Sequence, residues 1–328
     1  MGKLSEFKFM DLYVRLDAPD TPRYRSLRLD QNNKWSQPLP GEFHADAQKI
    51  INLLRTADND NPDTAFDYDN MHFRISRQKM ASGEEWVALR RINPRVPKLE
   101  ELGYAPHIAN YLRNIGRRDG LILFSGATGH GKTTSCFSLL QEYLKTYGGV
   151  GMTVEEPVEY MLEGPFGDQG YCYQIEVGNE EDWATPLKRC LRWTPRYMLV
   201  GEIRSPAAAE QILRAATTGH LVLTTIHAGS IEDSLMGLLH LAHRTLGDSA
   251  KNMLAQALTA AVHQVLNPTG PFIRYVFTEE ANNGDPVRAL IREDRIGMIN
   301  TYIDRQVARM QQLEKPVTPA AMPGKKVR

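Results

Sequence analysis

The chain has 328 residues, long enough for two domains, and its 39 lysines and arginines balance 39 aspartates and glutamates. This zero net charge argues against a dedicated nucleic-acid coat, although it leaves room for a local basic patch. Three widely spaced cysteines suit reduced thiols in the cytosol better than a disulfide frame or a zinc site. We see no signal peptide, and no apolar run approaches the roughly 18 residues of a membrane helix. Any membrane attachment is therefore expected to come through other subunits.

Residues 1–95 are predicted to form a separate α/β domain. Alternating apolar residues indicate a strand over 9–14, and near-helical apolar spacing indicates an amphipathic helix over 45–56. Two β-like runs, 70–77 and 86–92, favour a hairpin. Four basic residues on this hairpin would by default be solvated on strand faces: Arg74, Arg77, Arg90 and Arg91.

Two prolines within residues 93–97 indicate a linker to a second domain, predicted over 96–315. Strands and helices alternate in this domain, which predicts a parallel sheet with helices on both faces. Residues 316–328 are expected to be a flexible tail. The elements expected in the second domain are helix 99–114, strand 121–124, helix 132–147, strands 150–154 and 173–177, helix 183–192, strand 197–200, helix 206–217, strand 221–225, helices 231–244 and 249–266, strand 272–277, and helices 287–293 and 298–314.

The strand at 121–124 runs into the phosphate-loop pattern Gly126-x-x-x-x-Gly131-Lys132-Thr133. Glycines let successive backbone N–H groups surround a triphosphate, and the following helix adds the positive end of its dipole. Lys132 is expected to reach the β- and γ-phosphates of ATP, and the Thr133 hydroxyl to complete the shell of a Mg²⁺ ion. A glycine-rich turn with a stray lysine would meet the same spacing, but the flanking strand and helix favour the phosphate loop. The predicted nucleotide-binding residues are Gly126, Ala127, Thr128, Gly129, His130, Gly131, Lys132, Thr133 and Thr134.

Carboxylates follow two of the predicted strands. The strand over 150–154 ends in Glu155-Glu-Pro-Val-Glu159, and the strand over 197–200 is followed by Gly201-Glu202. Ligands bind at the carboxyl ends of strands in open parallel sheets. Phosphate-loop NTPases place an acidic residue after a second strand to serve Mg²⁺ and the attacking water, so Glu202 is expected to join Thr133 in the metal site. A surface glutamate that merely follows a strand is the plainer alternative.

Four motifs in this order resemble the secretion-ATPase superfamily, whose members drive type IV pili, type II secretion and type IV secretion. They are the phosphate loop, Thr-Val-Glu-Glu-Pro-Val-Glu at 153–159, Leu-Val-Gly-Glu-Ile-Arg at 199–204, and Thr-Gly-His-Leu-Val-Leu-Thr-Thr-Ile-His at 218–227. The resemblance extends from about residue 11 to 314. It implies a RecA-like nucleotide domain preceded by a small α/β, PAS-like domain.

Within the superfamily the chain is most similar to the retraction-class, PilT-like pilus ATPases and their relatives in conjugative and Dot/Icm-type secretion. Val-Arg-Ala-Leu-Ile-Arg-Glu at 287–293 resembles the retraction-class motif, and the four-cysteine zinc insertion of extension ATPases is missing. Val287 and Ala289 depart from the alanine and asparagine of that motif. These departures favour a conjugation or secretion relative over a housekeeping pilus motor.

The resemblance implies a role for each matching residue. Glu159 would activate the attacking water, Glu202 would support Mg²⁺ and the water network, and His220 and His227 would sense the γ-phosphate. Taken alone, each histidine would more often be a satisfied core or turn residue. Together with Lys132, Arg74 and Arg90, these residues form the predicted catalytic set.

Arginines of the N-terminal domain reach the γ-phosphate in this superfamily, and Arg74 and Arg90 hold the matching positions. A guanidinium there would neutralise charge on the equatorial oxygens. Arg189 and Arg192, on the helix before the 197–200 strand, match a second arginine-bearing helix, or form a solvated last turn favoured by the helix dipole. The sequence does not decide which of the four arginines acts on the phosphate.

The resemblance implies a homohexameric ring that hydrolyses ATP to power pilus retraction, type IV secretion or conjugative transfer. Its work would pass to an inner-membrane platform protein, so we expect a cytoplasmic protein at the inner face of that membrane, held there by partners and without direct nucleic-acid contact. A nucleotide-binding assembly or regulatory subunit with little turnover remains an alternative, as do a small-molecule kinase or GTPase and a nucleic-acid translocase. A GTPase would show Asn-Lys-x-Asp, and Asn33-Lys-Trp-Ser36 lacks the aspartate.

Overall fold

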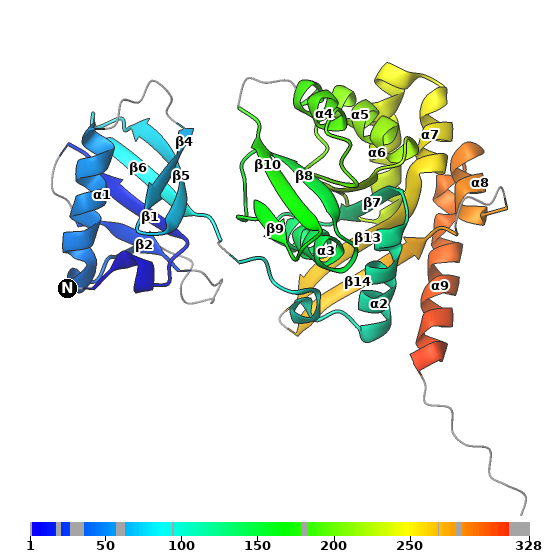
Figure 1. Ribbon diagram of the computed structural model, residues 1–328, viewed down its shortest axis with the longest axis horizontal. Helices are drawn as coiled ribbons and strands as arrows, with labels where there is room; N and C mark the ends of the chain where they lie inside the picture. The colour runs from blue at the N-terminus through cyan, green and yellow to red at the C-terminus, as the bar shows by residue number, and fades with distance from the viewer. Residues whose placement is uncertain are drawn as a thin grey trace, which may run out of the picture. The chain divides into compact units, whose positions relative to one another are not determined.

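The computed structural model describes residues 2–17, 21–26, 36–56, 63–93, 95–178, 183–267, 269–279 and 284–314. The chain divides into two compact units (Figure 1). The N-terminal unit comprises residues 1–95 and 157–161, and the C-terminal unit comprises 96–156 and 162–328. The first boundary falls in the proline-containing segment 93–97, whereas the assignment of 157–161 to the N-terminal unit has no counterpart in the sequence pattern. The predicted tail at 316–328 lies outside the described residues.

The N-terminal unit is built on an antiparallel sheet that has, within the described residues, six strands in the order β3-β2-β1-β6-β5-β4. Helix α1 (His44–Thr56) packs its apolar residues, among them Ile50 and Leu54, into one core with alternate strand residues such as Leu12 and Phe73. The strands are β1 (Asp11–Arg15), β2 (Arg23–Arg25), β3 (Gln37–Pro38), β4 (Asp63–Tyr68), β5 (Met71–Lys79) and β6 (Glu85–Arg91).

The predicted first strand, helix and hairpin of this unit are present as β1, α1 and the β5–β6 pair. Strands β2 and β3 were not predicted because they have only three and two residues and no apolar alternation. Short strands of this kind are held by backbone pairing with a neighbour, which leaves little trace in the side chains.

The C-terminal unit contains a second sheet with, in the described part of the chain, eight strands in the order β14-β13-β7-β12-β11-β8-β10-β9. The strands from β13 to β10 are parallel, and β14 and β9 add antiparallel edges. The parallel centre agrees with the prediction from alternating strands and helices. The strands are β7 (Gly120–Ser125), β8 (Gly149–Glu155), β9 (Gly164–Phe166), β10 (Gly170–Glu176), β11 (Tyr197–Val200), β12 (Leu221–Ile226), β13 (Leu258–Asn267) and β14 (Gly270–Phe277).

Helices cover both faces of this sheet. Helices α4 to α9 share one apolar core with alternate strand residues such as Leu121 and Leu123. Helix α3 contacts the same strands, but its buried side chains lie outside that core, so it covers the opposite face. The helices and short 3₁₀ turns are η3 (Leu99–Leu102), α2 (Pro106–Asn114), η4 (Ile115–Arg117), α3 (Lys132–Tyr147), α4 (Ala184–Leu191), α5 (Pro206–Thr217), α6 (Ile231–Leu246), α7 (Ser249–Ala257), α8 (Pro286–Arg292), η5 (Ile296–Met298) and α9 (Ile299–Glu314).

The prediction of one long helix over 249–266 is wrong. Helix α7 ends at Ala257, and the next ten residues form β13, which is parallel to β7 and antiparallel to β14. The alanines and leucines of this segment are good helix formers. Nevertheless every residue from Leu258 to Val262 is buried in the sheet, so tertiary pairing overrides local propensity. The predicted helix over 99–114 is likewise divided, because Gly103 adopts a left-handed φ of 76° between η3 and α2.

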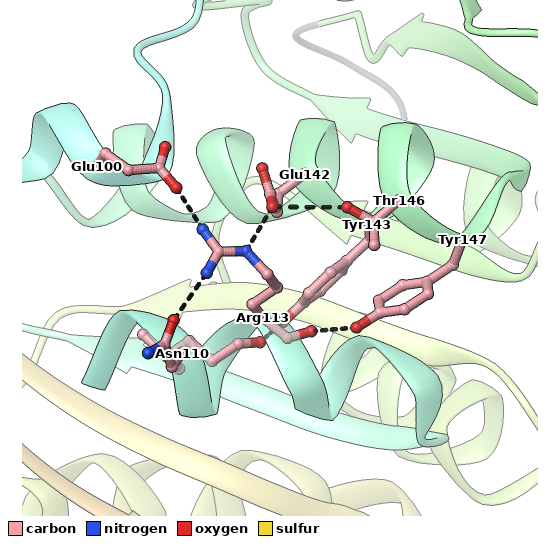
Figure 2. A network of polar contacts seen from close by, with 8 residues as sticks. Glu100, Asn110, Arg113, Glu142, Tyr143, Thr146 and Tyr147 are labelled. Atoms are coloured by element: carbon pink, nitrogen blue, oxygen red, sulfur yellow. Dashed lines mark hydrogen bonds and ion pairs between the residues drawn. The ribbon is translucent and has the colours of Figure 1, made fainter. Parts of the chain in front are cut away.

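Arg113 on α2 ties that helix to α3, the helix that follows the phosphate loop (Figure 2). Its Nε donates to Glu142 Oε1 on α3 at 2.6 Å, and its Nη2 pairs with the Glu100 carboxylate on η3. The hydrogen bond to Glu142 raises the pKa of Arg113, which keeps the guanidinium charged. The Tyr143 hydroxyl donates to the Leu112 carbonyl at 2.6 Å. Helix α3 is therefore held in place along its second half, away from its loop end.

The three cysteines, Cys136, Cys172 and Cys190, are buried free thiols. Burial raises the pKa of Cys172 to about 12 and that of Cys190 to about 11. Both thiols are therefore protonated at neutral pH, in keeping with the predicted absence of a disulfide frame. Among the described residues, no helix combines the length and the apolar character needed to cross a bilayer.

Candidate active site

The phosphate loop, residues 126–134, connects β7 to α3. All six residues of β7 are buried, which fixes the point where the loop leaves the sheet. Gly126, Gly129 and Gly131 have φ values of 147°, 80° and 77°, a region that favours glycine. A Cβ on Gly126 would lie 2.3 Å from the backbone oxygen of Gln264, so this glycine is required by space as well as by conformation.

Lys132 begins α3 and folds back over the loop. Its Nζ donates to the carbonyl oxygens of Gly126 at 2.9 Å and of Ala127 at 3.0 Å, and the residue is only 6% exposed. Thr133, which follows it, is half-buried in the first turn. The ammonium group and the amino end of a sixteen-residue helix therefore meet at one place, an arrangement that favours a bound anion.

The carboxyl ends of the central parallel strands lie at the same edge of the sheet as the phosphate loop. Ile226 of β12 is paired with Ser125 of β7, and Val200 of β11 is paired with Thr224 of β12. Residues that follow these strands therefore gather beside the loop. They include Glu202 and His227, as the sequence predicted.

Glu202 and His227 contact one another at this edge. His227 Nε2 lies 3.2 Å from Glu202 Oε1, and the other carboxylate oxygen accepts a 3.1 Å hydrogen bond from Arg204. The Thr225 hydroxyl donates to the Gly201 carbonyl at 2.7 Å, which fixes the backbone just before Glu202. The carboxylate is thus held between two basic groups, while the His227 side chain remains 46% exposed.

The acidic motif after β8 is divided between the two units. Glu155 is 2% exposed at the end of β8, where it accepts hydrogen bonds from Thr153 Oγ1 at 2.6 Å and Gln174 Nε2 at 3.0 Å. Glu159 is exposed and lies in the segment 157–161, which belongs to the N-terminal unit. The sheet edge itself therefore brings Glu155, rather than Glu159, to the level of the phosphate loop.

His220 lies at the opposite edge of the sheet. It precedes β12, its carbonyl accepts a hydrogen bond from the N–H of Gly120 at the start of β7, and its Nδ1 lies 2.5 Å from the Pro195 carbonyl. At about 3.3 Å per residue, the length of the strand separates it from the phosphate loop by about 20 Å. The prediction that groups His220 with Lys132 is therefore corrected: within its own unit, His220 directly precedes the start of β12, far from Lys132.

Arg74 and Arg90 are directly paired on β5 and β6 of the N-terminal unit. They line a cavity of about 310 Å³ together with Asp11 and Tyr13 of β1. Arg90 Nε donates to Asp11 Oδ1 at 2.9 Å, and Arg25 forms an ion pair with the other oxygen of the same carboxylate. Asp11 is 3% exposed, whereas the Arg90 side chain is 63% exposed. One buried carboxylate thus anchors an arginine whose end remains accessible.

Arg189 and Arg192 occupy the end of α4 in the C-terminal unit. Both are exposed, and they follow the predicted pattern of basic residues in a last turn. Their geometry agrees with either of the interpretations that the sequence left open.

Residues 41–293, a stretch that includes parts of both units, match the family described as Type II/IV secretion system protein. The chain belongs to this family. The identification from four motifs as a secretion-superfamily ATPase is thereby confirmed.

Similar proteins include motility and secretion proteins. Over 283 residues the chain is 29% identical to a twitching motility protein of Neisseria gonorrhoeae, covering 82% of this chain and 74% of that protein. It spans about half the length of other curated relatives. The fold resembles that of the pilus retraction motor PilT with bound ADP, with a TM-score of 0.70, 24% identity and coverage of 95% of this chain and 90% of that one. It also resembles the ATPase DotB of Legionella pneumophila, with a TM-score of 0.65, 20% identity and coverage of 93% and 84%. The predicted fold class is confirmed.

The donor set at the phosphate loop fits a magnesium nucleotide rather than a resident metal centre. The described residues contain no group of three or more histidines, cysteines or carboxylates able to hold a metal ion. Mg²⁺ usually takes few protein ligands and relies on phosphate and water oxygens. The Thr133 hydroxyl and the Glu202 carboxylate match this coordination preference of Mg²⁺.

Two residues of this site were missed from the sequence. Glu155 was noted only as one of several carboxylates, although its position directly at the strand end was a usable signal. Gln264 contacts the phosphate loop from β13, and the prediction of a helix over 249–266 removed any reason to place it there. No motif in the sequence points to it.

Proposed function

We propose that this protein is a homohexameric ATPase motor that hydrolyses MgATP to power a type IV pilus, in the retraction class, or a type IV secretion or conjugation machine. The observation that carries the proposal is the meeting of the phosphate loop, Lys132 and the Glu202–His227 pair at one edge of the parallel sheet. A phosphate cradle after β7 and a carboxylate after β11, at the same edge of one parallel sheet with β12 between them, is the arrangement needed to hold a triphosphate and its metal.

The residues of the C-terminal unit that gather at this sheet edge each have a definite role in the proposal. The backbone amides of residues 126–134 and the Lys132 ammonium would bind the phosphates. Thr133 and Glu202 would hold Mg²⁺, which supplies charge neutralisation when it is bound. His227, in contact with Glu202, would respond to loss of the γ-phosphate.

Two further roles fall to the N-terminal unit. We assign Glu159 the activation of the attacking water, which its exposure permits. We assign Arg90 the stabilisation of charge on the γ-phosphate, with Arg74 in support, because Arg90 is both anchored and accessible.

The remaining part of the proposal concerns partners. We expect a ring of six copies in the cytoplasm at the inner face of the inner membrane, held there by a membrane platform protein, with no direct nucleic-acid contact. Loss of the γ-phosphate would release charged contacts, and such a local change can drive a rigid-body movement.

The test is ATP binding and steady-state turnover by the purified protein. Lys132→Ala is expected to lose MgATP binding and to reduce turnover more than about 100-fold. Glu159→Gln is expected to bind MgATP and to reduce turnover by about 100-fold, because only the chemical step loses its base. Glu163→Gln changes another exposed glutamate, four residues further along the chain, and serves as the control with a wild-type rate.

The outcomes separate the alternatives. Wild-type-like turnover in Lys132→Ala would discard the phosphate-loop assignment, and the same result in Glu159→Gln would discard that residue alone. Binding of MgATP by the wild-type protein without phosphate release would favour the assembly or regulatory subunit.

A further inference from the structure

Gln264 of β13 lies directly behind the phosphate loop. It is 4% exposed, and both its backbone and its side chain face the loop. Its side-chain Nε2 donates to the His130 carbonyl at 2.7 Å, and its backbone oxygen lies 3.2 Å from His130 Nδ1. One residue outside the motif therefore contacts the loop twice at the same position.

The side-chain oxygen of Gln264 is fixed by two hydroxyl groups. Tyr104 Oη lies 2.7 Å from Gln264 Oε1, Ser135 Oγ lies 2.9 Å from it, and the two hydroxyls lie 2.5 Å apart. Burial raises the pKa of Tyr104, so the phenol keeps its proton and acts as a donor. The His130 carbonyl can only accept, so Nε2 must face it, and Oε1 then accepts from a hydroxyl on the other side; the amide group has a single favourable orientation.

This orientation decides where a loop N–H points. The His130 carbonyl and the Gly131 N–H belong to one planar trans peptide, so they point in opposite directions. When Gln264 Nε2 holds the carbonyl toward β13, the N–H of Gly131 is aimed away from β13. Ser135 Oγ lies 3.0 Å from the Gly131 carbonyl and 2.9 Å from Gln264 Oε1, so its single proton is donated to one of these two acceptors.

The glycines of the motif are packed against the same residue. A Cβ on Gly126 would lie 2.3 Å from the backbone oxygen of Gln264, and a Cβ on Gly131 would lie 3.0 Å from the side-chain Nε2 of the same residue. By contrast, a Cβ on Gly129 would have no heavy atom within 4 Å. The loop therefore packs against Gln264 at Gly126 and at Gly131, whereas there is free space beside Gly129.

We propose that Gln264 is a positioning residue for nucleotide binding, which fixes the 130–131 peptide so that the loop amides are already directed at the polyphosphate. Tyr104 and Ser135 hold its amide in the required orientation. The proposal rests on the proposed ATPase function and adds a residue that acts through the loop without touching the nucleotide.

Loss of Gln264 should therefore weaken nucleotide binding and leave the chemical step nearly unchanged. The loop amides bind the non-reacting phosphates about equally well in the ground state and the transition state. Interactions of that kind change KM and leave kcat nearly unchanged. If Gln264 had a purely structural role, its loss would lower the stability of the protein without raising KM selectively over kcat.

The experiment measures the Kd for MgADP together with KM and kcat for MgATP in the full-length protein. Gln264→Leu is expected to raise Kd and KM about tenfold or more and to change kcat less than about threefold. Gln264→Glu keeps the acceptor for the hydroxyls but loses the donor to His130, so it should raise both constants in the same way. Tyr104→Phe removes one donor and should raise them by about threefold.

Gln306→Leu is the matched control. Gln306 also braces backbone through its amide, accepting from Phe277 N at 2.9 Å and donating to Phe277 O at 2.7 Å, but on β14 and α9. It should lower the thermal midpoint as Gln264→Leu does, and leave Kd and KM unchanged.

Equal Kd and KM values in Gln264→Leu and Gln306→Leu would overturn the proposal, as would a fall in kcat without a rise in KM. Should Gln264→Leu fail to fold, Tyr104→Phe decides, because unchanged affinity there excludes an oriented amide. Failure of the wild-type protein to bind MgADP would instead refute the proposed function itself.

Discussion

The phosphate loop of the C-terminal unit and the arginine cluster of the N-terminal unit are built in opposite ways. The loop is shaped by backbone, with three glycines at positive φ and carbonyls that accept from Lys132. The cluster is made from side-chain ends, in which Arg90 and Arg25 share the buried carboxylate of Asp11. A backbone site depends on conformation and tolerates side-chain variation, whereas a side-chain site depends on the balance of charge.

This difference explains why the side chains of Ala127 and His130 should matter less to the loop than its backbone conformation does. In the proposed function it is the backbone amide groups of the loop that bind the phosphates. It also implies that a single methyl group in the wrong place should damage the loop more than loss of a whole charged group damages the cluster.

Gly126→Ala should produce the largest effect. The added Cβ would meet the Gln264 oxygen at 2.3 Å, and φ is 147°, so we expect a loss of about 2 kcal/mol or more in stability and more than a 100-fold loss of turnover. Gly129→Ala, with φ of 80° and open space, should cost only about 1 kcal/mol. Urea denaturation measures the stability of each variant, and phosphate release measures its turnover. Equal damage in the two variants would break the comparison.

Arg90→Ala should follow, with turnover reduced by about 10- to 100-fold and MgADP affinity nearly unchanged, because the lost charge acts on the γ-phosphate. Arg74→Ala should have a smaller effect, since Arg90 has the anchored position. The same kinetic assay on Arg189→Ala and Arg192→Ala completes the set. A greater loss of turnover in either of these would move the role to α4.

Asp11→Asn should reduce turnover by about tenfold, since it removes the charge that holds Arg90. Because both arginine partners are partly exposed, we expect only about 1–2 kcal/mol of lost stability. Asp67→Asn, at a carboxylate that is 73% exposed, is the control and should cost less than about 0.5 kcal/mol. Unchanged turnover in Asp11→Asn would show that Arg90 needs no anchor.

The smallest effect should be a pH dependence from His263, next to the end of β7. Its pKa is lowered by burial and by the positive charges of His130, Arg274 and Lys132. The unfolded chain therefore binds a proton more readily, so stability is present above about pH 6.5 and is lost as the pH falls toward the lowered pKa. Urea midpoints at pH 7.5 and 5.5 should converge slightly in His263→Gln. An unchanged difference would exclude His263 as a contributor.

The sequence was sufficient for the parts of this molecule that depend on local patterns. The phosphate loop, Glu202 after β11 and the hairpin with Arg74 and Arg90 were all placed correctly, because spacing and alternation reflect local backbone geometry. The short strands β2 and β3 were not found, since they are held by pairing rather than by side-chain burial.

Positions that depend on the complete sheet were beyond the sequence. His220 and His227 are an exception, because the predicted strand over 221–225 lies between them and already places them at its opposite ends, as β12 does. Gln264 was missed because its position depends on the sheet. Its strand is defined by its neighbours β7 and β14, while its own residues favour a helix.

The burial of Cys136, Cys172 and Cys190 has a practical consequence. Maleimide reagents react with exposed thiolates, so the native chain should be nearly silent toward them. A cysteine introduced on an exposed surface of either unit would then carry the only dye or crosslinker. Movements during ATP turnover could thus be followed by fluorescence in a protein that is otherwise wild type.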